Sequence, residues 1–109
     1  MSKISVLGCG GWGTALAMLC LDNGHEVVLW GKFKEEVKTL NETRSTRLLP
    51  GIYVPYEIFI TDDINKAVGS DIIIIATPSF AVRETAKLIS GIVNDKTVVV
   101  SVAKGFEKG

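Results

Sequence analysis

Short apolar segments alternate along this chain with longer segments whose apolar residues recur at helical spacing. The short segments are rich in β-branched residues and predict five strands: Lys3–Leu7, Glu26–Trp30, Ile58–Ile60, Asp71–Ala76 and Thr97–Val102. The segments between them predict four helices: Gly13–Asn23, Lys34–Asn41, Thr61–Val68 with Thr61 as its N-cap, and one opened by Pro78-Ser79. Because strands alternate with helices, we expect parallel strands joined by right-handed crossovers. The predicted fold class is α/β, with an open, doubly wound parallel sheet in the order 3-2-1-4-5.

Three of these segments also predict how their side chains are buried. Asp71–Ala76 contains an unbroken β-branched run, which is typical of a central parallel strand buried on both faces. Ala15–Leu21 is apolar on nearly every side, so the first helix is expected to be buried, with its alanines close to the sheet. In the last helix, Val82, Ala86 and Ile89 share one face, which we expect to point to the core.

Composition limits the number of domains and the kinds of partner. A chain of 109 residues, 47% hydrophobic and 22% charged, has the balance of one packed globular domain. Twelve basic and twelve acidic residues leave no net charge, which argues against nucleic acid or an anionic membrane as a partner. No segment approaches the roughly 20 apolar residues of a membrane span, and no export signal is recognisable. We expect a cytoplasmic protein in which Cys9 and Cys20 are reduced thiols.

The loop after the first strand, Gly8-Cys9-Gly10-Gly11-Trp12-Gly13, carries the strongest functional signal. Gly8 permits the tight turn out of the strand, Gly10 lets the backbone approach a pyrophosphate, and Gly13 lets helix and strand pack closely. The amides and the positive dipole end of the helix then face the phosphates. The alternative is a glycine-rich turn that binds nothing, but such a turn needs fewer glycines than this spacing supplies. We therefore expect a Rossmann-type dinucleotide-binding domain.

The end of the second predicted strand bears on which dinucleotide is bound. NAD-selective domains usually have an Asp or Glu there, about 20 residues past the loop, to hold the ribose 2′-hydroxyl. This chain has Trp30-Gly31-Lys32-Phe33-Lys34 instead, and Glu26 lies at the opposite end of the strand. A carboxylate would repel a 2′-phosphate, whereas Lys32 or Lys34 would attract one. We expect NADP(H) to be preferred and NAD(H) to be accepted; the alternative is that these lysines form only a solvated surface.

Four other residues have both a chemical and a structural interpretation. His25 lies at the amino end of the second strand, opposite the expected crevice, and is interpreted as structural. Cys9 lies at a helix start, which can lower the pKa of a thiol, but its position mainly requires a side chain that packs. Trp30 is expected to close the core, with stacking on adenine as the alternative. Ser79 is accounted for as a helix cap, although Pro78-Ser79 also borders the nicotinamide side of the crevice. We assign no metal ligands.

Segments along almost the whole chain resemble the amino-terminal domain of the bacterial-type NAD(P)-dependent glycerol-3-phosphate dehydrogenases. The Trp-Gly-Thr-Ala of the glycine loop and the Lys-Gly near the end of the chain are the most specific parts of the resemblance. The matching segments are Val6–Ala17, Asn23–Val27, Leu29–Gly31, Leu49–Ile52, Pro55, Thr61–Asp63, Ala76–Ser79 and Ser101–Gly105.

The resemblance implies an enzyme that interconverts glycerol 3-phosphate and dihydroxyacetone phosphate by hydride transfer with a nicotinamide, and that supplies phospholipid synthesis. Gly11 and Trp12 are then cofactor contacts in the loop. Lys32 stands where the family often has His or Arg near the adenosine 2′ position. Lys104 matches the family lysine that touches both cofactor and substrate, although taken alone it would be an ordinary solvated lysine. A small-molecule substrate and a possible homodimer of the full-length protein also follow from the resemblance.

Two departures from the family pattern affect these expectations. Leu48-Leu49-Pro50 stands where members often carry Tyr-Leu-Pro, so an aromatic contact there is in doubt. The chain ends at Gly109, before the family's helical substrate domain, which carries the general-base lysine and most phosphate-binding residues. We expect residues 1–109 to be one dinucleotide-binding domain, a fragment of a longer two-domain enzyme, which binds cofactor without turnover.

Two rival functions are weighed against this interpretation. One is the NADP domain of a ketopantoate reductase-like enzyme or of a hydroxy-acid dehydrogenase, against which the Trp-Gly-Thr-Ala loop and the Lys-Gly argue. The other is a non-catalytic cofactor-sensing domain with a protein or DNA partner. Zero net charge and the absence of a helix-turn-helix pattern argue against that second function.

Overall fold

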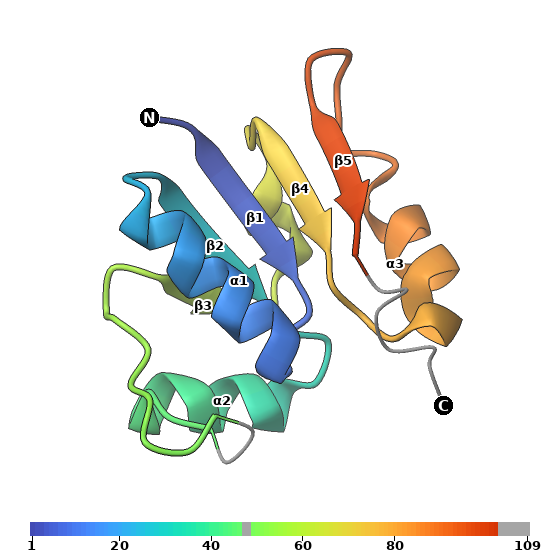
Figure 1. The fold of residues 1–109 in the computed structure, drawn as a ribbon. Helices are drawn as coiled ribbons and strands as arrows, with labels where there is room; N and C mark the ends of the chain where they lie inside the picture. The colour runs from blue at the N-terminus through green and yellow to red at the C-terminus, as the bar shows by residue number, and fades with distance from the viewer. Residues whose placement is uncertain (47–48, 103–109) are drawn as a thin grey trace.

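Five parallel strands form one sheet in the order β3-β2-β1-β4-β5, which confirms the predicted topology (Figure 1). The computed structural model describes residues 1–46 and 49–102. Its strands are β1 (Lys3–Leu7), β2 (Glu26–Trp30), β3 (Phe59–Thr61), β4 (Ile72–Ile75) and β5 (Val98–Ser101). Its helices are α1 (Gly11–Asp22), α2 (Lys34–Thr43) and α3 (Val82–Ile89), with the 3₁₀ turns η1 (Ile64–Ala67) and η2 (Ser79–Ala81).

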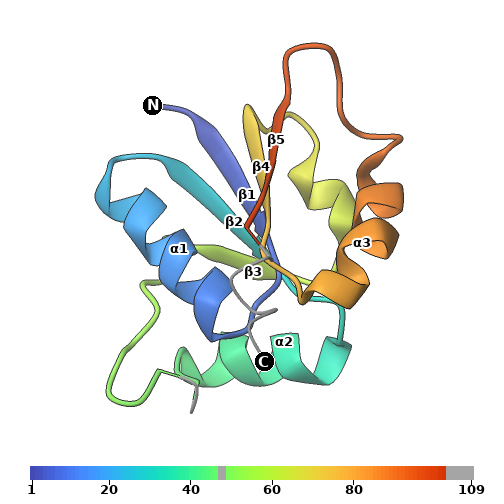
Figure 2. The same ribbon diagram turned by 45° about the vertical axis from the view of Figure 1, so that its right-hand side comes forward.

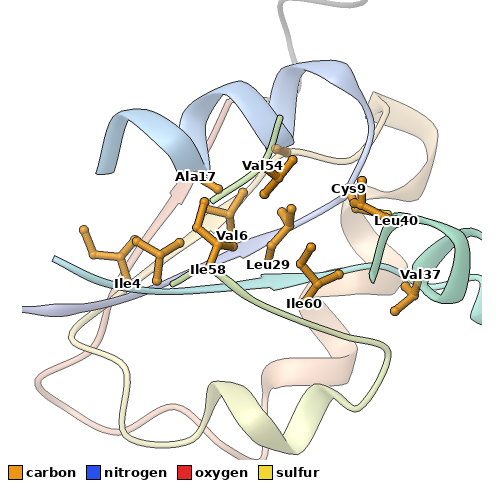
Figure 3. Packing of buried hydrophobic residues seen from close by; sticks show 12 residues of the cluster. Ile4, Val6, Cys9, Ala17, Leu29, Val37, Leu40, Val54, Ile58 and Ile60 are labelled. Carbon is orange, nitrogen blue, oxygen red and sulfur yellow. The ribbon is translucent and has the colours of Figure 1, made fainter. Parts of the chain in front are cut away.

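The sheet lies between α1 on one face and α3 on the other, as the turned view shows most clearly (Figure 2). Successive side chains of a strand point to opposite faces, so neighbouring residues enter different clusters. Val6 and Leu29 belong to a cluster that also contains Ala17 of α1 (Figure 3). Their neighbours Leu7 and Trp30 belong to the cluster that contains Ile89 of α3. The central strands are therefore in apolar contact on both faces, as a doubly wound sheet requires.

β4 lies between β1 and β5, as predicted for a central strand, but its two faces are buried to different extents. Ile73 and Ile75 are 1% and 2% exposed in the cluster on the α3 side. Ile72 and Ile74 are only half-buried against the opposite cluster. The difference arises because α1 packs over β1 and β2 and does not extend across β4.

The expectation that the first helix is buried holds for one side of α1 only. Its buried residues are Gly13, Thr14 and Ala17, whereas Leu19 is 57% exposed. Small side chains let the helix approach β1 and β2 closely on one side. Four larger apolar residues of the same helix are half-buried against the same core cluster: Leu16, Met18, Cys20 and Leu21.

The predicted helix that starts at Thr61 is replaced by the short 3₁₀ turn η1. Thr61 is the last residue of β3, and its hydroxyl accepts a hydrogen bond from the Asp63 amide at 3.0 Å. Asp63 is the N-cap of η1, where its carboxylate accepts from the Asn65 amide at 3.0 Å. The cap is displaced by two residues because a carboxylate caps at least as well as a hydroxyl.

The helix predicted after Pro78 begins later than expected and turns a different face to the core. η2 comes first, and the N-cap position of α3 is Ala81, two residues after Ser79. Thr85 and Ile89 are the buried residues of α3, and Ala86 is exposed. The core stripe follows the spacing i, i+3, i+7 from Val82, and Ala86 lies beyond the edge of that stripe.

The carboxyl ends of β1, β2 and β4 are held together beyond the last residues of the strands. The Gly8 amide donates to the Trp30 carbonyl oxygen at 2.7 Å, and the Ala76 amide donates to the Leu7 carbonyl oxygen at 2.9 Å. The loops that leave these three strands therefore start at one edge of the sheet. Ligands of open α/β sheets bind at this edge, where the strand order reverses.

Candidate functional site

A crevice of about 360 Å³ opens at the carboxyl ends of β1, β2 and β4. Its walls come from the glycine loop and from the segments that follow β2 and β4. The first turn of α2 and the 3₁₀ turn η2, which precedes α3, complete them. The lining residues are Gly8, Cys9, Gly10, Gly11, Trp12, Gly13, Trp30, Lys32, Phe33, Glu36, Ala76, Thr77, Pro78, Phe80 and Ala81. Three crossovers of the fold thus contribute to one concave site.

Backbone sterics explain why two of the loop positions must be glycine. Gly8 has a φ of +128°, and a Cβ on it would lie 2.8 Å from the Ala76 carbonyl oxygen. A Cβ on Gly13 would collide with the Gly8 carbonyl oxygen. Gly10 differs, because a Cβ there would meet no described atom within 4 Å. The loop is therefore tightly packed at Gly8 and Gly13 and open at Gly10, as expected for the point of closest approach by a pyrophosphate.

The N-terminus of α1 is electrostatically suited to an anion. The first turn of any helix exposes backbone amides at the positive end of its dipole. In α1 the N-cap Gly10 supplies no side chain to these amides, and the first turn contains no acidic residue. By contrast, Glu35 and Glu36 occupy the first turn of α2, and Glu84 occupies that of α3. Among the α-helices of residues 1–46 and 49–102, α1 is thus the one whose first turn has no acidic side chain to repel a phosphate.

Two residues of the crevice lining each contain a buried polar atom without a hydrogen-bond partner among the described residues. The atoms are the indole Nε1 of Trp30 and the hydroxyl Oγ1 of Thr77, and these side chains are 4% and 8% exposed. A buried polar group without a partner costs about 1–3 kcal/mol, and nearly all such groups in folded proteins are satisfied. Both atoms fit a ligand that presents oxygen atoms, as the ribose and phosphate groups of a dinucleotide do.

The rim of the crevice carries one ion pair. Lys32 Nζ lies 3.0 Å from Glu84 Oε1, and the two side chains are 49% and 61% exposed. The same ammonium lies 5.8 Å from the centre of the Phe33 ring. Lys34, the second lysine expected near a 2′-phosphate, begins α2 and is not among the lining residues. Lys32 is therefore the candidate cation of this site.

Cys9 lines the crevice as a neutral thiol. Burial, and then the nearby Glu36 carboxylate, raise the pKa of Cys9 to about 12. The thiol donates a hydrogen bond to Glu36 Oε1 at 3.3 Å, and the Thr14 hydroxyl donates to the Cys9 carbonyl oxygen at 3.2 Å. Burial also raises the pKa of Cys20, and both cysteines are free. These contacts support the packing interpretation of Cys9 and not a reactive thiolate.

The structure brings most of the predicted site residues together. Lining the crevice are the predicted Gly8, Gly10, Gly11, Trp12, Gly13, Lys32 and Pro78. Lys104 and Leu48 lie outside the described residues. His25 lies at the amino edge of the sheet, where its Nδ1 accepts from the Ser2 amide at 3.1 Å. Trp30 belongs to the core, as expected, and it is also one of the residues that line the crevice.

Several lining residues were not predicted from the sequence. Thr77 comes shortly after the end of β4, just as Gly8 follows β1. Its position at a strand end could therefore have predicted that it lines the crevice. Glu36 lies in the first turn of α2, and Phe80 lies in η2, before α3. Their place in the lining depends on how those elements dock, which has no local signature in the sequence.

Two searches of the described part of the chain were negative. Residues 1–46 and 49–102 contain no group of three His, Cys, Asp or Glu side chains that could hold a metal ion. No helix within the same residues has the length and apolar character needed to cross a bilayer.

Known proteins are similar in sequence to almost the whole of this chain. A relative from Fusobacterium nucleatum, glycerol-3-phosphate dehydrogenase [NAD(P)+], is 43% identical over 99% of this chain and 33% of its own length. A second such enzyme, from Lactobacillus delbrueckii, is 44% identical over 98% of this chain and 32% of its own length. The chain thus spans about a third of the length of these relatives.

Solved structures agree with the sequence matches. The crystal structure of glycerol-3-phosphate dehydrogenase from Coxiella burnetii has a TM-score of 0.84 and 29% identity, covering 92% of this chain and 31% of that one. A UDP-D-ManNAc dehydrogenase from Pyrococcus horikoshii, at 21% identity and a TM-score of 0.81, shares the fold. The model of the NAD-dependent glycerol-3-phosphate dehydrogenase N-terminus matches residues 3–109. The chain therefore belongs to the NAD-dependent glycerol-3-phosphate dehydrogenase family, to whose N-terminal domain it corresponds.

Proposed function

We propose that this chain is the cofactor-binding domain of an enzyme that interconverts sn-glycerol 3-phosphate and dihydroxyacetone phosphate, in support of phospholipid synthesis. The observation that carries the proposal is the crevice at the strand ends, which is lined by the glycine loop at the start of α1 and by two residues with unpartnered buried polar atoms, Trp30 and Thr77. Family membership supports a nicotinamide cofactor and this substrate pair. When bound, the nicotinamide supplies the hydride acceptor or donor of the reaction.

The residues of the crevice have distinct proposed roles toward the dinucleotide. The pyrophosphate lies on the α1 N-terminus, against the loop residues Gly8, Gly10, Gly11, Trp12 and Gly13. Trp30 Nε1 and Thr77 Oγ1 donate to oxygen atoms of the cofactor, because both are buried donors without a partner in the described chain. Pro78 borders the nicotinamide side. Lys104, outside the described residues, is proposed to contact cofactor and substrate on the family resemblance alone.

The cofactor preference is proposed from the charge at the end of β2. Lys32 is the cation of the crevice lining, and the segment after β2 has no acidic residue before α2. Glu36 also lines the crevice, where it accepts the hydrogen bond of Cys9. An ammonium at this place attracts a 2′-phosphate. NADP(H) is therefore the preferred cofactor and NAD(H) the weaker one. A homodimer of the full-length enzyme and a cytoplasmic location stay predictions.

Titrating the chain with NADPH and with NADH tests the proposal. We expect both to bind, NADPH more tightly, and Lys32→Gln to weaken NADPH binding by about tenfold while NADH changes little. Lys34→Gln is the matched control. It removes the same charge from a residue two positions further along the chain, which does not line the crevice. Tighter binding of NADH by the unaltered chain contradicts the NADP preference. Binding of neither dinucleotide contradicts the proposed cofactor function itself.

The substrate is tested on the full-length protein. Reduction of dihydroxyacetone phosphate, followed by the loss of NADPH absorbance, is the expected activity. Turnover of ketopantoate or of another keto acid, with no turnover of dihydroxyacetone phosphate, would replace the proposed activity by that of a rival dehydrogenase.

A further inference from the structure

Lys32 forms an ion pair with Glu84 of α3, a helix that follows another wall of the crevice. Lys32 follows β2, whereas Glu84 belongs to the first turn of α3, 52 residues further along the chain. Their side chains meet at 3.0 Å, and this is the one ion pair within residues 1–46 and 49–102. Because Lys32 lines the crevice and η2, directly before α3, also lines it, the pair connects two walls of the site.

Because of where the pair lies, Glu84 is expected to affect the affinity for a ligand and to have little effect on the free energy of unfolding. Ion pairs between side chains as exposed as these typically contribute almost nothing to folding. A 2′-phosphate that binds Lys32 must either displace the Glu84 carboxylate or share the ammonium with it. In the shared arrangement, two anions lie within about 6 Å of each other and repel. A cofactor with a 2′-hydroxyl meets neither obstacle.

We propose that Glu84 competes with the 2′-phosphate of NADP(H) for Lys32 and thereby sets the ratio of NADP(H) to NAD(H) affinity. The inference rests on the proposed function, in which Lys32 receives that phosphate. Glu84 acts through the lysine and is a specificity-determining residue, with no part in hydride transfer. The pair lowers the selectivity for NADP(H) below the level that Lys32 alone would give, which fits a domain that accepts both cofactors.

The test compares Glu84→Gln with the unaltered chain in titrations with NADPH and NADH at low ionic strength. Glutamine keeps the shape of the side chain and removes its charge. We expect the ratio of the NADH to the NADPH dissociation constant to rise by about threefold to fivefold. The rise should shrink in about 0.5 M salt, where exposed charges are screened. Glu26→Gln makes the same change in net charge at the amino end of β2 and is expected to leave the ratio unaltered.

A double variant separates this inference from the proposal on which it rests. In the Lys32→Gln background, Glu84→Gln should no longer change the ratio, because the contested cation is gone. If Lys32→Gln weakens NADPH selectively but Glu84→Gln leaves the ratio unchanged or lowers it, Glu84 does not compete and this inference alone fails. If Lys32→Gln has no selective effect, the proposed role of Lys32 fails and the inference fails with it. An undiminished effect of Glu84→Gln in the double variant also overturns the competition.

Discussion

The carbonyl oxygen of Gly8 occupies the place that a side chain on Gly13 would need. The turn that leaves β1 and the first turn of α1 therefore approach each other too closely for any side chain at Gly13. Gly10, between them, has open space where a Cβ would stand. The same loop thus contains one glycine required by packing and one whose neighbouring space is free for a ligand.

Gly13→Ala should destabilise the fold itself. The methyl group would overlap the Gly8 carbonyl, so strand and helix must separate, at a cost of about 1–3 kcal/mol or more in the free energy of unfolding. Urea unfolding followed by circular dichroism measures this loss. Gly10→Ala is the matched control, and we expect it to leave the free energy of unfolding within about 1 kcal/mol of the original.

For cofactor binding, in contrast to stability, Gly10→Ala is the variant with the larger expected effect. A methyl group at Gly10 enters the space that the pyrophosphate is proposed to use, so NADPH binding should weaken by tenfold or more although the protein is folded. Equal NADPH affinity of Gly10→Ala and the unaltered chain would place the pyrophosphate elsewhere. A Gly13→Ala variant with unchanged stability would contradict the close packing of β1 against α1.

Thr77→Val should weaken cofactor binding without weakening the fold. Valine has nearly the same shape and lacks the buried hydroxyl that has no partner in the described chain, so the free energy of unfolding should stay level or rise. Losing one hydrogen bond to the cofactor should raise the NADPH dissociation constant by roughly two- to tenfold. Thr85→Val replaces a buried threonine outside the crevice lining and should leave that constant unchanged. A lower free energy of unfolding for Thr77→Val would instead indicate that the hydroxyl has a partner within the protein.

Cys9 should make the stability of the protein fall at alkaline pH. Its pKa is about 12 in the folded chain against a reference value of 9.0, so between these values the folded state keeps a proton that the unfolded state releases. Stability is therefore fully retained below about pH 9 and decreases above it, by at most about 1.4 kcal/mol per pH unit from this one group. Comparing urea unfolding of the original chain and Cys9→Ala from pH 8 to 10.5 isolates the effect. Parallel pH profiles for the two would show that Cys9 titrates normally.

The sequence was sufficient for the parts of the fold that depend on local pattern. The β-branched runs and the glycine spacing are properties of adjacent residues, and they correctly placed five parallel strands, their order and the loop at the crevice. The 3₁₀ turn at Asp63 and the exposed outer side of α1 were missed. Competing caps two residues apart differ little in energy, and a uniformly apolar helix does not reveal how far its neighbours extend.

Contacts between distant segments were beyond the reach of the sequence. Arg44, for which the sequence predicts no role, is buried and has a φ of 55°. Its guanidinium donates to the carbonyl oxygens of Pro55 and Ile58 at 3.0 and 2.9 Å, which ties the end of α2 to the segment before β3. The pairing of Lys32 with Glu84 is of the same kind, because it depends on the docking of α3 beside the end of β2. Both were unforeseen because no periodicity links the partners.

The parallel arrangement of every strand pair has a consequence for the order of events in folding. In the described residues no two adjacent strands of the sheet are joined by a hairpin, so each pairing closes a long loop. The crevice forms only when the segments from Gly8 to Ala81 that line it have docked. The dinucleotide can therefore bind only late, and it should slow unfolding without accelerating folding. At a hundred times its dissociation constant it adds about 2.7 kcal/mol to the free energy of unfolding. In a cell, the cofactor pool would then set the lifetime of this domain against proteolysis.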